Sequence, residues 1–321
     1  MKKILPFCDN PIIKTYPYIA FYLGILEGNG VDVTKLLIKE FSNIFFFRGK
    51  IDFVASGFFH KKYFYCKPNR FFIKKNIENI ISEINKEHYI VVILNERYIN
   101  TVNSSLTVDF PHDWIIYGYD NEEKIFHCAG YVERFGLRRY ESIKLSYSEI
   151  AEALKKCPIF NSFTFTSKDT HSAWIKKIPN IEIDRSYIKR ILYNFLNPPI
   201  ISIHYRPIIN LDIKAVKLLK VSLNSKIKNW DKLKNKRLWT QSFRILYENI
   251  IVLNLICKNY INNIEINKES NELSKRSYSL LLLVEKYNFY PKKLTLIAIV
   301  RYLDMFYLQE KKIIESMIES I

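Results

Sequence analysis

The sequence predicts an α+β domain followed by an all-helical domain, because its pattern changes along the chain. Up to about residue 166, apolar β-forming runs alternate with amphipathic helical segments. Beyond about residue 183, long stretches repeat apolar side chains at three- and four-residue intervals. All eight glycines lie at or before Gly136, so the remainder has few positions suited to tight turns. We therefore predict one domain over residues 1–166 and a helical domain over residues 183–321.

The first domain should contain short helices between strands. The predicted helices cover residues 11–26, 32–41, 75–86 and 146–156. The predicted strands cover residues 44–47, 63–65, 88–94, 113–120, 124–129 and 160–166. The polar residues 121–123 connect two of these strands and indicate a hairpin. Ser146 and Glu149 have the spacing of a capping box, which predicts that a helix begins there.

Residues 167–182 are predicted to form a linker, and helical signals follow it. Asp184 should cap the first helix of the second domain, and Pro198 and Pro199 should end it. The later predicted helices cover residues 211–227, 232–260, 271–287 and 294–318. The second domain is therefore expected to be built from long helices.

Composition and charge restrict the class of protein. The five cysteines form no CxxC pair, and the N-terminal residues lack the apolar run of a secretory signal, so we expect a cytoplasmic protein. The apolar windows are shorter than the roughly 20 residues that span a bilayer, so no membrane partner is expected. Neither GxGxxG nor GxxxxGK(S/T) occurs, so a dinucleotide or P-loop nucleotide site has no support.

Two residues suggest nucleophilic catalysis. Cys8 lies shortly before the first predicted helix, and His112 opens a predicted strand about one hundred residues later. A helix N-terminus favours a thiolate, and an imidazole beside it would complete a nucleophilic pair, as in papain-like enzymes. The spacing alone also fits a cysteine that fills the core and a histidine at the surface.

A resemblance to a known family favours the catalytic interpretation. Phe7-Cys8, the block HDWIIYGYD over residues 112–120, and the Ile125-Phe126 strand are followed by a helical second half. In this order they resemble the butirosin-type aminoglycoside acyltransferases. They also resemble the cysteine-protease-like amide synthases of nonribosomal peptide and closthioamide-type pathways. The block at residues 112–120 is the specific part of the match.

The resemblance implies a papain-like cysteine protease fold that makes amide bonds in natural-product or antibiotic biosynthesis. Cys8 would take an acyl group from the phosphopantetheine thioester of a carrier protein and pass it to an amine, with His112 as the base. No metal or organic cofactor is implied. Related peptidases place a Gln shortly before the cysteine, and this chain has none there. Backbone N–H groups at the helix start would then bind the oxyanion.

The residue that orients His112 is left open by the sequence, because the family position reads Cys128-Ala129-Gly130-Tyr131. Asp120 lies eight residues further along the same strand, roughly 26 Å away at about 3.3 Å per residue. Asp113 should point to the opposite face of the sheet. Asp113 and Asp120 are instead expected to serve the strand start and the hairpin turn. Three candidates for the orienting residue remain, namely Glu133, Asn95 and Asp109.

The chain carries 49 Lys and Arg against 32 Asp and Glu, a formal charge of +17 concentrated in the C-terminal half. A basic face such as residues 226–237 would suit an acidic acyl or peptidyl carrier protein. The same face could be an ordinary solvated surface or bind nucleic acid, and a nucleic acid is the less favoured partner. Two further alternatives stay open: a cysteine peptidase or thioesterase with the same Cys/His pair, and a non-catalytic basic binding protein.

Overall fold

The structure, a computed structural model, combines helices with antiparallel sheets. The residues it describes are 1–47, 50–53, 63–68, 77–100, 102, 107–134, 137–157, 171–176, 180–197, 201–203, 206–208, 212–233 and 237–321. The chain divides into two compact units. The first unit comprises Met1–Val33 and Phe58–Pro179, and the second comprises Thr34–Gly57 and Asn180–Ile321.

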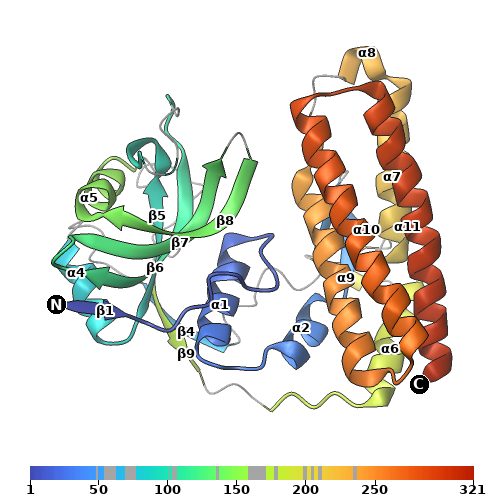
Figure 1. Cartoon of the computed structure of the whole chain (residues 1–321), viewed down its shortest axis with the longest axis horizontal. Helices are drawn as coiled ribbons and strands as arrows, with labels where there is room; N and C mark the ends of the chain where they lie inside the picture. The colour runs from blue at the N-terminus through green and yellow to red at the C-terminus, as the bar shows by residue number, and fades with distance from the viewer. Residues whose placement is uncertain are drawn as a thin grey trace. The chain divides into compact units, whose positions relative to one another are not determined.

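An antiparallel sheet of seven described strands forms the centre of the first unit (Figure 1). Its strands are β1 (Lys2–Ile4), β4 (Phe64–Pro68), β5 (Tyr89–Asn95), β6 (Pro111–Asp120), β7 (Ile125–Arg134), β8 (Leu137–Ser146) and β9 (His171–Ile175). Their order is β4-β9-β5-β6-β7-β8, and β1 pairs with the end of β6. Every residue of β5 is buried, which agrees with a central strand covered on both faces.

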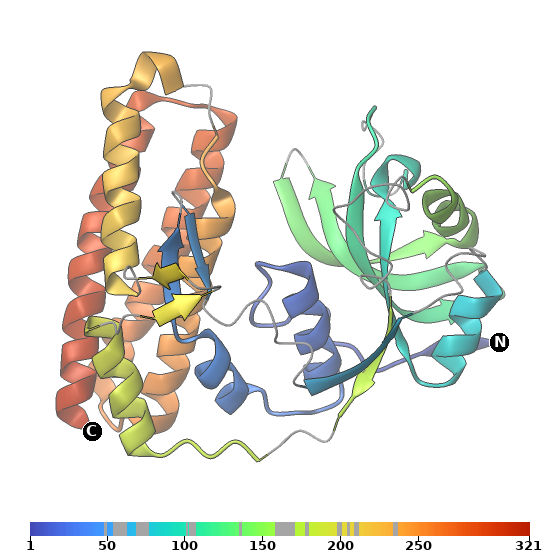
Figure 2. The same cartoon turned by 180° about the vertical axis from the view of Figure 1, so that it is seen from behind.

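Helices cover both faces of this sheet. The helix α1 (Pro17–Gly28) contacts β6 and β7, whereas α4 (Ile77–Asn85) contacts β5 and β6, and α5 (Tyr147–Lys155) contacts β5 and β8. Figures 1 and 2 show α1 on one side of the sheet and the other two helices on the opposite side. A short 3₁₀ turn, η2 (Glu96–Tyr98), follows β5 directly. This turn places residues 95–98 at the end of the strand that pairs with His112.

Several predicted elements of the first unit are confirmed and others are wrong. Ser146 and Glu149 form the predicted capping box of α5. The first helix begins at Pro17 rather than residue 11, because a proline inside the helix would clash with the preceding turn. The predicted linker contains β9, which lies between β4 and β5 in the sheet. The strands β1 and β8 were not predicted, and the predicted strand over residues 160–166 lies outside the described residues.

Helices dominate the second unit (Figure 2). They are α2 (Thr34–Phe41), α6 (Arg185–Leu196), α7 (Ile213–Lys228), α8 (Trp230–Leu233), α9 (Thr240–Tyr260), α10 (Ile264–Phe289) and α11 (Lys293–Ser320). Two small hairpins join them, β2 (Ile44–Phe47) with β3 (Lys50–Phe53), and β10 (Ile201–Ile203) with β11 (Arg206–Ile208). Asp184 caps α6 as predicted, since its side chain accepts from the Tyr187 N–H at 2.7 Å.

Residues 34–57 belong to the second unit, so the predicted contiguous division at residue 166 differs from the structure in this segment. The Asp212 carboxylate accepts from the Ile44 N–H at 2.8 Å, and the Asp212 N–H donates to the Ile44 carbonyl at 2.7 Å. The Asn249 amide donates to the carbonyls of Phe41 and Ser42. These long-range hydrogen bonds attach α2 and the β2–β3 hairpin to α7 and α9.

The long helices of the second unit follow the predicted apolar spacing with two differences, although the two hairpins show that the prediction of an all-helical domain is wrong. The helix predicted over residues 271–287 begins earlier, at Ile264. The predicted helix over residues 232–260 is interrupted, since α8 ends at Leu233 and α9 begins at Thr240. The helices α9, α10, α11 and α7 pack in succession through their apolar faces. Within the described part of the chain, no helix has both the length and the apolar composition that crossing a membrane requires.

Candidate functional site

Cys8 lies on the loop that connects β1 to α1. Its N–H donates to the carbonyl oxygen of Gly24 at 2.8 Å, which places it beside the C-terminal half of α1. The predicted position at the N-terminus of a helix is therefore wrong. The α1 helix begins at Pro17, seven residues before the Gly24 that Cys8 contacts, so the proposed oxyanion donors at the helix start are not next to Cys8 either.

Glycines let the backbone before Cys8 approach α1 closely. A Cβ atom added at Gly28 would lie 2.4 Å from the Phe7 Cα, and one added at Gly24 would lie 2.8 Å from the Cys8 carbonyl oxygen. The Phe7 ring stacks on Tyr117 of β6, with ring centroids 4.5 Å apart. The Cys8 backbone is thus held between α1 and the sheet.

The half-buried Cys8 thiol has a carboxylate as its neighbour. Glu27, in the last turn of α1, accepts a hydrogen bond from the Ile12 N–H at 3.4 Å, and its charge acts on the Cys8 thiol. Burial and the nearby charges of Glu27 and Asp9 raise the pKa of the Cys8 thiol. The sequence predicted the opposite, a thiolate favoured by a helix N-terminus. At neutral pH Cys8 is therefore a thiol that must lose its proton when it attacks.

His112 stands near the start of β6, opposite Leu94 of β5. Its ring stacks on Phe110 with centroids 5.9 Å apart and meets Tyr131 edge-on at 6.0 Å. Burial, together with the positive charge of Arg138, lowers the pKa of His112 to about 4. The imidazole is therefore neutral at pH 7 and can accept a proton.

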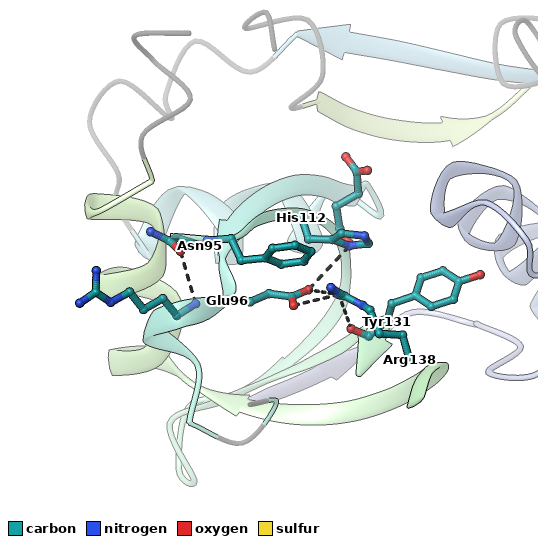
Figure 3. A network of polar contacts seen from close by, with 8 residues as sticks. Asn95, Glu96, His112, Tyr131 and Arg138 are labelled. Carbon is teal, nitrogen blue, oxygen red and sulfur yellow. Dashed lines mark hydrogen bonds and ion pairs between the residues drawn. The ribbon is translucent and has the colours of Figure 1, made fainter. Parts of the chain in front are cut away.

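A buried carboxyl group lies beside this imidazole (Figure 3). The Glu96 Oε1 atom is 3.7 Å from His112 Nδ1, and Glu96 is 1% exposed. Arg138 Nη2 donates to both Glu96 oxygens at 2.7 and 2.8 Å and to the Tyr131 carbonyl at 3.0 Å. Burial raises the pKa of Glu96 to about 7, although Arg138 opposes this shift.

Asn95 does not orient the histidine. Its amide nitrogen donates to Asp109 Oδ1 and to the Lys156 carbonyl, both at 3.0 Å. Its oxygen accepts from the N–H groups of Phe110 and Arg97. Asn95 and Asp109 therefore fasten the loop that leads into β6, which is a structural role one step away from the imidazole.

In the part of the chain that the structure describes, no hydrogen bond or ion pair joins Glu133 to His112. Glu133 is half-buried on β7 opposite Arg138 of β8, and its charge acts on Glu96. Asp120 serves the hairpin turn as predicted, since its carboxylate accepts from the N–H groups of Glu122 and Glu123. The Asp113 carbonyl oxygen lies 3.4 Å from His112 Nδ1.

The first unit thus holds two groups of chemically useful side chains, Cys8 with Glu27 and His112 with Glu96 and Arg138. Among the described residues, no hydrogen bond or ion pair joins Cys8 to His112. Tyrosines lie between the groups: the rings of Tyr131 and Tyr140 are 5.9 Å apart, and the charge of Cys8 affects the pKa of Tyr140.

Sequence reasoning missed Glu27, Glu96 and Arg138. Glu27 could have been found, because it is the only charged residue in the apolar segment that forms α1. Glu96 follows the candidate Asn95 directly at the end of a buried strand, which also marks it as unusual. Arg138 carried no such signal, since its partner depends on how β8 aligns in the sheet.

The residues that the structure describes contain no group of three or more His, Cys, Asp or Glu side chains arranged to hold a metal ion. No protein-family model matches the chain, and no curated protein matches it either.

Proposed function

We propose that this protein is a cysteine-dependent acyltransferase whose first unit has a papain-like fold. It moves an acyl group from a carrier-protein thioester through Cys8 to an amine and so forms an amide bond. The observation that carries the proposal is the position of Cys8. The half-buried Cys8 is held by a backbone hydrogen bond to α1, and the charge of a nearby carboxylate, Glu27, acts on its thiol.

The other four cysteines differ from Cys8 in the accessibility or the surroundings of their thiols. Cys128, Cys157 and Cys257 are buried, and burial raises the pKa of Cys128 and Cys257. Cys66 is exposed on β4, and its sulfur lies 3.7 Å from the Tyr22 hydroxyl. Only an accessible thiol can reach a substrate carbonyl. Cys66 also has that access, so Cys66→Ala is the natural control.

The reaction proceeds in two displacements. The Cys8 sulfur attacks the thioester carbonyl while its proton passes to a base, and the carbon–sulfur bond to the carrier arm breaks. The arm leaves as a thiol after it receives a proton. The amine then attacks the acyl-cysteine, loses a proton, and releases Cys8. The sequence resemblance assigns the proton transfers to His112, whose neutral imidazole is able to accept.

Intact-protein mass spectrometry tests the proposal. The wild type, Cys8→Ala and Cys66→Ala are each mixed with an acylated carrier protein, with and without added amine. We expect an acyl adduct on the wild type and on Cys66→Ala that disappears as amide forms, and no adduct on Cys8→Ala. An adduct that survives in Cys8→Ala, or no adduct on the wild type with several acyl groups, would overturn it.

The same experiment distinguishes the proposed acyltransferase from a hydrolase. A cysteine peptidase or thioesterase would form the same adduct and release a free acid whether or not amine is present. Amide as the main product at moderate amine concentration supports the transferase, because the acyl-enzyme must then react with the amine faster than with water.

One observation favours a binding function. The helix α7 carries five lysines and no acidic residue, so it can contribute to a basic surface. If the protein only binds an acidic carrier protein, Cys8→Ala retains its function and charge reversal at Lys214 and Lys217 abolishes binding. The acyltransferase predicts loss of turnover with Cys8→Ala and retained carrier binding.

A further inference from the structure

A cavity of about 480 Å³ lies in the first unit, where two strands share one edge of β6. Along this edge β5 pairs with residues 111–116, and β1 pairs with residues 118–120. Residues of both strands and of the neighbouring strand β9 line the cavity. Its volume falls within the range of about 300–1,000 Å³ that is typical of sites for small molecules.

Three stacked rings form a row across the sheet that ends beside this cavity. Trp174 of β9 pairs with Tyr65 of β4, and their ring centroids are 5.8 Å apart. From the side of β5, the His88 ring stacks on Trp174 with centroids 4.4 Å apart and an interplanar angle of 17°. His88 and Trp174 both line the cavity. In the described part of the chain His88 has no second ring partner, so a planar ring bound in the cavity can extend the row.

A buried carboxylate holds the His88 ring in this position. Glu83 Oε2 lies 2.9 Å from His88 Nδ1 and accepts from Ser172 Oγ at 3.0 Å. Glu83 Oε1 accepts from Lys86 Nζ at 2.7 Å. Burial raises the pKa of Glu83, but these hydrogen bonds lower it to about 2, so Glu83 is ionised at neutral pH. Because this carboxylate contacts Nδ1, the ring nitrogen left for a ligand is Nε2.

Two lysines give the cavity a positive charge. The Lys3 ammonium donates to the Asn85 carbonyl at 3.0 Å, which holds it beside the cavity that Lys3 lines. Lys86 lines the cavity as well, and its side chain is largely exposed. The one carboxylate among the lining residues belongs to Glu87, which is exposed and lies 3.9 Å from Lys3 Nζ. Two ammonium groups against one carboxylate suit a ligand with a phosphate group.

We propose that this cavity binds a nucleoside monophosphate, with its base stacked on His88 and its phosphate at Lys3 and Lys86. The base extends the row of rings, and stacking of this kind accepts any base because each has a flat π-face. A single phosphate carries about two negative charges at neutral pH, which the two ammonium groups match. This binding requires neither Cys8 nor a carrier protein, so the inference is separate from the proposed acyl transfer.

Isothermal titration calorimetry of the whole protein tests the proposal with three probes, namely AMP, adenosine and inorganic phosphate. A salt concentration of about 0.15 M screens weak binding to the basic surface. We expect AMP to bind about tenfold or more tightly than either of the other probes, because only AMP supplies both a ring and an anion. No binding of AMP, or AMP that binds no more tightly than phosphate, overturns the proposal. Cys8→Ala should bind AMP like the wild type, whatever the outcome for acyl transfer.

Variants test the two halves of the site separately. Lys3→Gln with Lys86→Gln should weaken AMP binding about tenfold or more and leave adenosine binding unchanged. His88→Leu should weaken AMP binding several-fold, and His88→Phe, which keeps a flat ring, should retain part of the affinity. Lys144→Gln removes an exposed lysine of β8 and is the matched control, and circular dichroism checks that each variant is folded. If the double lysine variant binds AMP like the wild type, the ligand lies elsewhere and the proposal is wrong.

Discussion

Arg138 and Glu96 form a charge pair in the first unit, in which one guanidinium nitrogen donates to both carboxylate oxygens at 2.7 and 2.8 Å. The two residues come from different parts of the sheet: Arg138 belongs to β8, and Glu96 follows β5. The same nitrogen bonds the Tyr131 carbonyl, so the pair also ties β7 into the arrangement (Figure 3). His112 is therefore positioned next to a charge pair that three strands share.

Removal of Arg138 should destabilise the protein in a pH-dependent way. Arg138→Met leaves the buried Glu96 carboxylate without its cation, which typically costs about 3 kcal/mol or more. Glu96 has a folded pKa raised to about 7, so it escapes this cost by protonation at low pH. We expect a larger loss in thermal midpoint at pH 8 than at pH 5. An equal loss at both values would contradict the role of the Glu96 charge, and Glu96→Gln with Arg138→Met should recover part of the loss at pH 8.

The His112 imidazole should titrate well below the ordinary range. Burial and Arg138 place its pKa at about 4, which NMR titration between pH 3 and pH 8 can measure, with His112→Asn to assign the signal. Because the folded pKa lies below that of the unfolded chain, His112 reduces stability as pH falls from about 6.5 to about 4. Arg138→Met should raise the pKa of His112. A titration midpoint near 6.5 in the wild type would show that the ring is not desolvated as described.

Glu310 should make the second unit less stable as pH rises. This residue of α11 is 1% exposed, and neither of its carboxyl oxygens has a hydrogen-bond partner within the described residues. Burial, helped by the charge of Asp212, raises its pKa to about 8. The folded chain then binds more protons than the unfolded chain between about pH 4.5 and pH 8, so stability falls by up to about 1.4 kcal/mol per pH unit there.

A glutamine at position 310 removes this titration. We therefore expect Glu310→Gln to raise the thermal midpoint at pH 8 and to leave it nearly unchanged at pH 5. Glu319→Gln, near the exposed end of the same helix, is the matched control and should show no such difference. A Glu310→Gln variant that is less stable than the wild type at pH 8 would contradict the raised pKa.

Gly28→Ala should displace Cys8 indirectly, through the neighbouring residue Phe7. The added methyl group would lie 2.4–2.7 Å from the Phe7 backbone, so Phe7 and the adjoining Cys8 must move. We expect a loss of about 1–3 kcal/mol in the free energy of unfolding and a change in the rate of Cys8 alkylation. Gly30→Asn is the control, because Gly30 has a positive φ that Asn tolerates and no atom crowds its Cβ position. Equal effects of the two substitutions on Cys8 would contradict the close approach at Gly28.

The predictable parts of the fold are those that local sequence determines. The helices of the second unit follow apolar spacing, and α5 follows its capping box. By contrast, β8 contains four charged residues (Arg138, Arg139, Glu141 and Lys144), and β9 lies within a segment that has the appearance of a linker. Both strands are stabilised by pairing with neighbouring strands of the sheet. Such long-range pairing produces only a weak pattern in the local sequence.

The candidate site likewise contains some residues that the sequence predicts and others that it does not. The sequence singled out Cys8 and His112 through their residue types and the block around His112, and both lie in the first unit. It could not find Arg138, because the contact with Glu96 depends on the alignment of β8 with β7. Because residues 9–16 form a loop, α1 begins further from Cys8 than the sequence predicts. Cys8 therefore lies near the Glu27 carboxylate and not at the N-terminus of a helix.

The division of the chain affects the order in which it can fold during synthesis. Residues 34–57 leave the ribosome early. The Ile44 N–H, however, donates its hydrogen bond to Asp212, which is synthesised 168 positions later. The first unit is complete once Pro179 has been made, whereas α2 and its hairpin still lack the helices that bury them. A nascent chain that stops near residue 180 therefore carries an unburied aromatic hairpin, which is a natural target for a chaperone.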